Sequence, residues 1–216
     1  NAKLRKENRV NIKKNSIDTD APLDGKILIM LFEKPSTRTR ISFDLAVKQL
    51  GGKSLILNPD EIHYGIGNES LHDMAKILSQ YADIVMLRTD AHKKVEDFSK
   101  YLNIPIINGL TDLSHPCQIM SDIMTFEELR GPIQNKKITW LGDGNNVVYS
   151  LIEAAVQFDF ELHIACPKGF EPSKNILQWA KKNKGNISVS KDPIDAVSSA
   201  DCVITDKWIS MGDKIN

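Results

Sequence analysis

Residues 26–32, with the sequence KILIMLF, decide the fold together with the helical pattern that follows them at residues 37–50. Every position after Lys26 in the first stretch is apolar, which is typical of a strand whose two faces are both covered. The same succession of a short apolar run and a longer amphipathic segment recurs along the chain. Repetition of this β-α-β-α kind predicts parallel sheets with helices on both faces.

The pattern predicts strands and helices throughout the chain. We expect strands at residues 26–32, 53–58, 83–88, 104–108, 137–141, 161–166, 187–190 and 202–205. We expect helices at residues 37–50, 69–81, 93–101, 118–129, 146–158, 173–182 and 194–198. Residues 130–132, Arg-Gly-Pro, end the helix that begins near Gln118. We therefore predict one domain over residues 1–130 and a second over residues 131–216, with four strands in each.

Composition excludes several classes of protein. The 28 basic and 28 acidic residues cancel, so we expect neither a nucleic acid nor a membrane surface as partner. No apolar run approaches the roughly 20 residues of a membrane-spanning helix, and the polar N-terminal residues show no signal peptide. Three cysteines without C-x-x-C spacing argue against a disulfide framework or a zinc site and favour the cytoplasm. The histidines show no metal-ligand spacing.

Ligands of open α/β sheets bind beyond the carboxyl ends of the strands, so the residues there are the candidate site. After the first strand, residues 36–40 read Ser-Thr-Arg-Thr-Arg. Ser36 is a good N-cap, and the backbone N–H groups of a helix start attract anions. Arginine forks onto phosphate oxygens, so this segment predicts a cradle for phosphate or carboxylate. A capped helix with solvated arginines is the alternative.

Other strand ends also carry polar side chains. Arg88 ends the third strand, and His115 and Gln118 stand on either side of Pro116, which suits a first helical turn. Asn146 follows the fifth strand, within Gly-Asp-Gly-Asn-Asn, and Asp206 follows the last. Each has a plain structural alternative: an exposed strand-end arginine, a structural histidine, a simple turn into a helix, and an aspartate N-cap.

Together these segments resemble the aspartate/ornithine transcarbamoylase family, and most closely its ornithine carbamoyltransferases. Residues 36–40 match the family's carbamoyl-phosphate motif, and residues 115–118 match its His-Pro-x-Gln motif. Residues 140–146, WLGDGNN, look like the ornithine enzymes. Asp206 with residues 210–212, Ser-Met-Gly, matches the ornithine-type signature, which aspartate carbamoyltransferases lack.

The resemblance implies a role for each matching residue. Those expected to bind carbamoyl phosphate are Ser36, Thr37, Arg38, Thr39, His63, Arg88, His115 and Gln118. Those expected to bind ornithine are Asn146, Asp206, Ser210 and Met211. Among them Arg38, Arg88 and His115 are the expected catalytic residues. His63 matches a loop residue that in relatives reaches the phosphate of a neighbouring subunit.

The implied reaction is transfer of the carbamoyl group of carbamoyl phosphate to the δ-amine of L-ornithine, giving L-citrulline and phosphate, in arginine biosynthesis or a urea-cycle-type step. The implied fold is α/β, with two doubly wound parallel-sheet domains and the active site between them. The second domain is expected to be incomplete in this chain. No cofactor or metal is implied, and the implied assembly is a homotrimer or a multiple of trimers. Two alternatives stay open: a transcarbamoylase with another amine acceptor, and a truncated, non-catalytic small-molecule-binding module.

Overall fold

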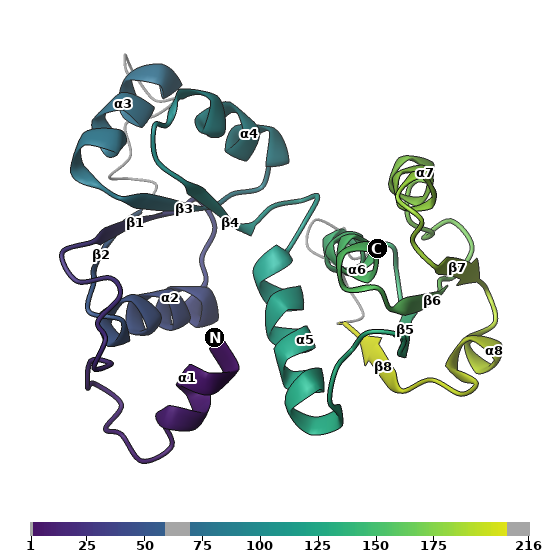
Figure 1. Cartoon of the computed structure of the whole chain (residues 1–216). Helices are drawn as coiled ribbons and strands as arrows, with labels where there is room; N and C mark the ends of the chain where they lie inside the picture. Colours follow the sequence, from purple (N-terminus) through teal and green to yellow (C-terminus); the bar gives the residue numbers. More distant parts are fainter. Residues whose placement is uncertain (1, 59–69, 207–216) are drawn as a thin grey trace. The chain divides into compact units, whose positions relative to one another are not determined.

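The computed structural model describes residues 2–58 and 70–206. Contacts divide the chain into two units, Asn1–Thr111 and Asp112–Asn216, each built around its own parallel sheet (Figure 1). This division falls before the helix Pro116–Arg130, whereas the predicted boundary follows it. The helix groups with the second unit because its buried residues Ile119, Ile123 and Phe126 belong to that unit's core.

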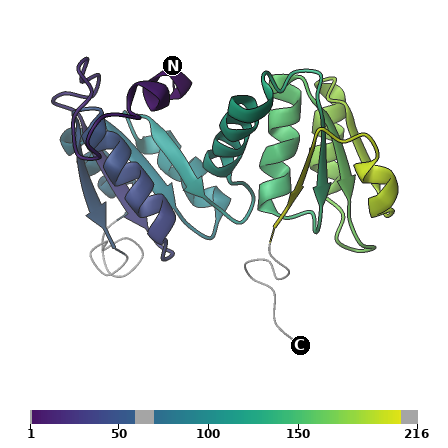
Figure 2. The same cartoon turned by 90° about the horizontal axis from the view of Figure 1, so that it is seen from below.

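The first unit has a four-stranded sheet in the order β2-β1-β3-β4, and all its pairs are parallel. Its strands are β1 (Ile27–Phe32), β2 (Lys53–Leu57), β3 (Ile84–Arg88) and β4 (Ile106–Leu110). Its helices are α1 (Ala2–Asn8), α2 (Thr37–Gln49), α3 (Leu71–Tyr81) and α4 (His92–Tyr101). Helix α2 lies along one face of the sheet, and α3 and α4 cover the other (Figures 1 and 2).

Side-chain alternation along the central strands explains how both faces are buried. Ile29 and Leu31 of β1 join the core under α3 and α4, whereas Met30 joins the core under α2. On the neighbouring β3, Met86 belongs to the α2 side. Because strand side chains alternate with a period of two, Arg88 lies on the same face as Met86. The strand pattern therefore directs Arg88 toward helix α2.

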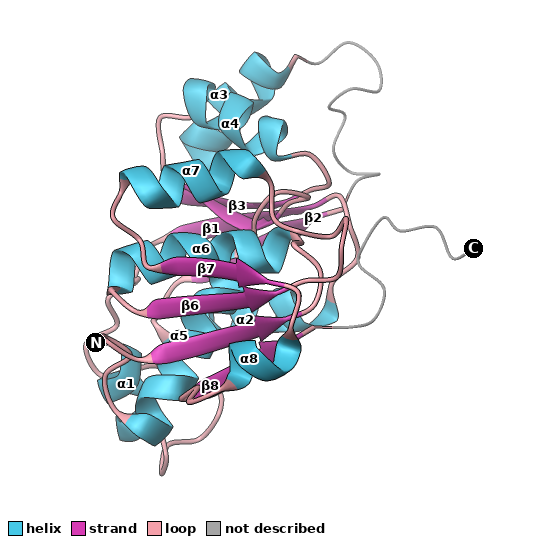
Figure 3. Ribbon diagram, turned by 90° about the vertical axis from the view of Figure 1, so that its right-hand side faces the viewer, coloured by secondary structure: helices cyan, strands magenta, loops and turns pink. Residues whose placement is uncertain are grey.

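The second unit has a four-stranded parallel sheet in the order β7-β6-β5-β8. Its strands are β5 (Lys137–Leu141), β6 (Glu161–Ala165), β7 (Ile187–Ser190) and β8 (Cys202–Thr205). Its helices are α5 (Pro116–Arg130), α6 (Asn146–Phe158), α7 (Lys174–Lys182) and α8 (Pro193–Val197). Helices α6 and α7 cover one face, and α8 covers the other (Figures 1 and 3). The predicted α/β class with two parallel sheets of four strands is confirmed.

Helix α1 is the one described element that the sequence pattern did not predict. None of its residues is buried, so it has no apolar face to produce a helical period. Ion pairs hold it instead: Arg5 contacts Asp18 at 2.8 Å and Asp20 at 2.6 Å, and Arg9 also pairs with Asp18. Within residues 2–58 and 70–206, no helix is long and apolar enough to cross a membrane.

Candidate functional site

The start of helix α2 forms the first part of the candidate site. Ser36 has an extended backbone, and its Oγ accepts a hydrogen bond from the Thr39 backbone N–H at 3.3 Å. Ser36 is therefore the N-cap that its position after β1 predicted. The first turn of a helix presents backbone N–H groups and the positive end of the helix dipole, which together favour an anion.

Arg88, at the end of β3, reaches this helix start. Its side chain donates from Nη1 to Thr39 Oγ1 at 3.3 Å, and the residue is only 9 % exposed. The buried Nε makes no hydrogen bond to any described residue. Burial, and next the positive charge of Arg38, lower the pKa of Arg88. A buried guanidinium with a spare donor, beside a second guanidinium and a helix N-terminus, is an environment suited to a phosphate group.

A network of polar side chains joins the two segments that form this anion site, the loop after β1 and the turn after β3. The carboxylate Oε2 of Glu33 accepts hydrogen bonds from Thr89 Oγ1 at 2.5 Å and from Lys94 Nζ at 2.6 Å. The Glu33 backbone N–H also donates to the Arg88 carbonyl at 2.9 Å. Burial opposes the charge of Lys94, but its bonds to Glu33 and Asp90 raise its pKa overall. Glu33 thus ties the loop after β1 to the turn after β3.

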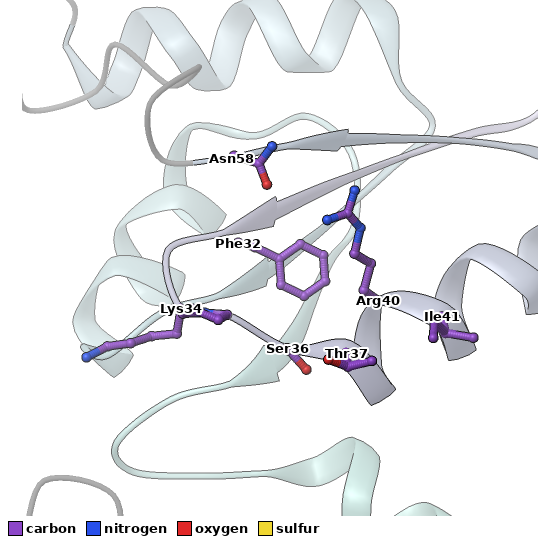
Figure 4. Close-up of a pocket in the computed structure, with 8 residues that line it drawn as sticks. Phe32, Lys34, Ser36, Thr37, Arg40, Ile41 and Asn58 are labelled. Atoms are coloured by element: carbon purple, nitrogen blue, oxygen red, sulfur yellow. The ribbon is translucent and has the colours of Figure 1, made fainter.

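The two arginines of the 36–40 motif take different directions. A hollow of about 460 Å³ lies beside the start of α2, and Figure 4 shows Arg40 extending into it toward Asn58. The hollow is lined by Phe32, Lys34, Pro35, Ser36, Thr37, Arg40, Ile41 and Asn58. Arg38 and Arg88 are not among these residues. Positions two apart on a helix do not share a face, so the motif divides into Arg38 near Arg88 and Arg40 in the hollow.

His115 and Gln118 lie together at the start of α5 in the second unit. His115 is the N-cap residue, but its imidazole makes no cap hydrogen bond, and its backbone N–H donates to Ser150 Oγ at 2.8 Å. Pro116 occupies the first turn, as predicted. Gln118 donates from Nε2 to Asp122 Oδ1 at 2.9 Å. Burial raises the pKa of Asp122.

The loop after β5 is held tightly from several directions. The buried Trp140 donates from its indole Nε1 to the Asp143 carbonyl at 3.0 Å, and the Gly144 N–H donates to the Phe170 carbonyl at 2.6 Å. A Cβ atom on Gly144 would lie 2.4 Å from the Pro172 backbone nitrogen. Only glycine fits this close approach of two backbone segments.

Replacing Gly144 with alanine is therefore expected to destabilise the protein by about 2 kcal/mol or more, because a backbone atom cannot yield as a side chain can. Urea unfolding measures this change in the free energy of unfolding. Gly169→Ala serves as the control: its φ of +91° is strained for alanine, but an added Cβ meets nothing within 4 Å. If the two substitutions lower the free energy of unfolding equally, the close approach to Pro172 does not restrict the residue at position 144.

Asn145 connects this loop to Asp206, the residue after β8. Its Oδ1 accepts from the backbone N–H groups of Val147 at 2.9 Å and Val148 at 3.2 Å, capping α6. Its Nδ2 donates to Asp143 Oδ1 at 3.1 Å and to Asp206 Oδ2 at 3.3 Å. Asn146, the predicted ornithine ligand, is the first residue of α6 and is half-buried.

The structure thus places the predicted residues in three groups, of which His115 and Gln118 at the start of α5 form one. Ser36, Thr37, Arg38, Thr39 and Arg88 lie together in the first unit. In the second unit Asp206 accepts a hydrogen bond from Asn145, the residue before Asn146. His63, Ser210 and Met211 lie outside the described residues. The described ranges contain no group of three or more His, Cys, Asp or Glu side chains able to hold a metal ion.

The sequence pattern did not single out Glu33 and Asn145. Both had a local signal. Glu33 directly follows an apolar strand, where a charged side chain lies at the ligand-binding edge. Asn145 directly precedes a helical pattern, where asparagine is a preferred N-cap. Their contacts with Thr89 and Asp206 cross 56 and 61 residues, which no local pattern reveals.

Comparison with known proteins places the chain in a family. Its residues 2–128 match the carbamoyl-phosphate-binding domain of aspartate/ornithine carbamoyltransferases, and residues 134–216 match the aspartate/ornithine-binding domain. The ornithine carbamoyltransferase of Brucella ovis is 50% identical over 195 residues, which cover 90% of this chain and 62% of the relative. That of Rhizorhabdus wittichii is 47% identical over 208 residues, covering 96% of this chain and 67% of the relative.

Solved structures agree with these matches. The ornithine carbamoyltransferase from Pyrococcus furiosus superposes with a TM-score of 0.87 and 41% identity, covering 97% of this chain and 67% of that one. The enzyme from Burkholderia thailandensis superposes with a TM-score of 0.84 and 35% identity, covering 95% of this chain and 69% of that one. The chain spans 62% of the length of the first curated relatives. By both domains, the chain belongs to the aspartate/ornithine carbamoyltransferase family.

Proposed function

We propose that the full-length protein transfers the carbamoyl group of carbamoyl phosphate to the δ-amine of L-ornithine, giving L-citrulline and phosphate. The feature that carries this proposal is Arg88, a buried guanidinium with a spare Nε–H beside Arg38 and the N-terminus of α2. A buried guanidinium beside a second positive charge is costly without an anion. The phosphate of carbamoyl phosphate supplies that anion, and relatives that match both domains are named ornithine carbamoyltransferases.

The reaction follows from the charges that develop in it. The neutral δ-amine attacks the carbonyl carbon, and negative charge grows on the carbonyl oxygen. The bond from carbon to the phosphate oxygen then breaks, and the proton that the amine loses ends on the departing phosphate. Arg38, Arg88 and His115 are the proposed stabilisers of that oxygen, with Thr39 as a further donor. A donor aimed at developing charge contributes about 3 to 4 kcal/mol to lowering the barrier. The phosphate leaves within the Ser36–Thr39 segment, which binds it throughout.

Ornithine binding is assigned to the second unit. Asp206 is proposed to accept the α-ammonium group, with Asn146, Ser210 and Met211 completing the site. Gln118 is proposed to hold the carbamoyl group together with His115. The division into a carbamoyl-phosphate-binding domain at residues 1–130 and an ornithine-binding domain at residues 131–216 stays a proposal. The family matches at residues 2–128 and 134–216 support it, whereas contacts group α5 with the second unit.

The wider setting is also proposed. A homotrimer, or a multiple of trimers, is proposed with His63 serving a neighbouring subunit; the mass of the full-length protein in solution tests the assembly. The reaction belongs to arginine biosynthesis or a urea-cycle-type step. A cytoplasmic location is proposed because the sequence has three cysteines without C-x-x-C spacing.

Product analysis tests the reaction directly. The full-length protein is incubated with carbamoyl phosphate and L-ornithine, and citrulline and phosphate are expected in equal amounts. Putrescine, N-acetylornithine and L-aspartate are offered in parallel, and we expect turnover at least about 100-fold slower with each. Faster turnover with one of them would assign a different acceptor. Carbamoyl-phosphate binding by calorimetry without any turnover would favour the non-catalytic module.

The rate of the reaction is expected to depend on pH through the attacking amine. A free aliphatic amine has a pKa of about 10, so below that pH its neutral fraction rises about tenfold for each pH unit. At low ornithine concentration, kcat/KM for ornithine should therefore rise steeply from about pH 6 to pH 8. Stopped assays of citrulline across that range measure this slope. A flat profile would contradict attack by an amine that must first lose its proton.

A further inference from the structure

The side chain of Asn145 uses every hydrogen-bonding position that an amide has. Its oxygen accepts hydrogen bonds from the backbone N–H groups of Val147 and Val148. Its nitrogen donates to two carboxylate oxygens, one of Asp143 and one of Asp206. A primary amide offers two N–H donors and one acceptor oxygen, so these partners fix the orientation of the amide.

These four bonds serve two separable purposes. The two accepted bonds cap α6, and Ser or Asp caps a helix about as well as Asn. The two donated bonds bring carboxylate oxygens from two different strand ends onto one nitrogen atom. Capping therefore does not explain why the residue is an asparagine, because neither Ser nor Asp could donate to both carboxylates.

Hydrogen bonds from outside it hold the loop that carries Asn145, and this loop in turn holds the Asp206 side chain. Trp140 and Phe170 anchor the loop through Asp143 and Gly144, with bonds of 3.0 and 2.6 Å. Asp206 lies on the surface at the end of β8, where an aspartate side chain has several accessible rotamers. Its carboxylate is tied to the loop by the bond from Asn145 at 3.3 Å.

We propose that Asn145 is a positioning residue for the amino-acid substrate: its amide group holds the carboxylate of Asp206 beside that of Asp143, oriented to receive the substrate's α-ammonium group. This inference rests on the proposed binding of ornithine by Asp206. Two carboxylates drawn to one amide concentrate negative charge, which favours a cation over a neutral amine. Fixing the Asp206 rotamer before binding reduces the entropy lost when the substrate arrives.

Two variants separate positioning from capping. Asn145→Ser and Asn145→Asp both keep a side-chain oxygen for α6 but donate to neither carboxylate in the manner of the amide. In the full-length protein we expect each to lower kcat/KM for ornithine by at least about tenfold, mainly through KM, since bonds to charged groups are lost. Asn145→Asp should lower kcat/KM for ornithine more than Asn145→Ser does, because its added charge repels the two carboxylates. Carbamoyl-phosphate affinity, measured by calorimetry, should stay within about twofold of the parent value.

Asp192→Ser is the matched control, because Asp192 caps α8 in the same unit with bonds to the N–H groups of Ile194 and Asp195. Its kinetic constants should equal those of the parent protein. If kcat and KM for ornithine in Asn145→Ser stay within twofold of the parent values, Asn145 acts only as a helix cap and the proposal is overturned. An equal loss for both substrates in that variant would also overturn the proposal.

A double-mutant cycle with Asp206→Asn tests whether Asn145 acts through Asp206. Asn145→Ser should lower kcat/KM for ornithine by at least about tenfold in the parent protein. In the Asp206→Asn background the same substitution should lower it by less than about threefold. Equal costs in both backgrounds would overturn the proposal. If Asp206→Asn by itself leaves kcat/KM for ornithine unchanged, the proposed substrate assignment of Asp206 fails. If Asp206→Asn lowers kcat/KM for ornithine and Asn145→Ser does not, only the positioning inference fails.

Discussion

Replacing Arg88 with methionine is expected to weaken carbamoyl-phosphate binding by about 100-fold and to stabilise the unbound protein by about 1 kcal/mol. The loss of affinity follows from removing charge-assisted hydrogen bonds to phosphate. The gain in stability follows because Arg88 is 9 % exposed, stands beside the positive charge of Arg38, and has a buried Nε without a partner among the described residues. A methionine of similar length removes the repulsion from Arg38 and the buried Nε without a partner, and it loses one hydrogen bond to Thr39.

Thermal unfolding with and without carbamoyl phosphate measures both effects. The melting temperature of the parent protein should rise with carbamoyl phosphate, whereas the variant should start higher and respond much less, because a ligand stabilises only the state that it binds. Arg130→Met, at the exposed end of α5, is the control and should retain the response to ligand. A variant that melts lower than the parent protein and keeps full affinity would make Arg88 a structural residue and exclude it from the anion site.

Replacing Asp206 with asparagine is expected to lower kcat/KM for ornithine by about 100-fold, because an ammonium group loses its charged partner while the shape of the side chain is retained. The amide oxygen of the new residue still accepts from Asn145, so the loop after β5 should keep its structure. Steady-state kinetics at saturating carbamoyl phosphate measure the change.

Carbamoyl-phosphate affinity is the internal control for this variant and should stay within about twofold. Asp195→Asn, on the exposed side of α8, is the matched control and should leave both substrates unaffected. A parallel loss of affinity for both substrates in Asp206→Asn would indicate a folding defect. Unchanged ornithine constants would assign the α-ammonium group to another residue.

Most elements were predictable because their signals are local. Strands β5, β7 and β8 and helix α6 have the predicted bounds, since apolar runs mark the strands and Asn145 marks the start of α6. Strand β4 begins at Ile106 rather than at residue 104, because Pro105 has no N–H to donate and pairs through its carbonyl alone. Helix α1 has no buried face, and its ion pairs with Asp18 and Asp20 have no periodic signature.

The candidate site was predictable only in part. Position at or just after a strand end was enough to select Ser36, Arg88 and Asp206, because parallel strands end at one edge of a sheet. That Ser36 caps α2 is confirmed. The motif at residues 36–40 predicts a single cradle and does not predict the different directions of Arg38 and Arg40. Helical geometry separates residues two apart, and the position of β2, which carries the chain to Asn58, decides what Arg40 meets.

The amino-acid sequence by itself determined the alternation of strands and helices, the α/β class and the polar residues at the strand ends, because these depend on periodicity and capping within a few residues. Only the tertiary structure decided which strand ends are neighbours. Strand β1 pairs with β3, so Phe32 lies opposite Arg88, and β5 pairs with β8, so Leu141 lies opposite Thr205. Strand order is set by the packing of helices against whole sheet faces, which joins residues about 50 to 60 positions apart. For that reason the contacts of Arg88 with Thr39 and of Asn145 with Asp206 exist only in the folded chain.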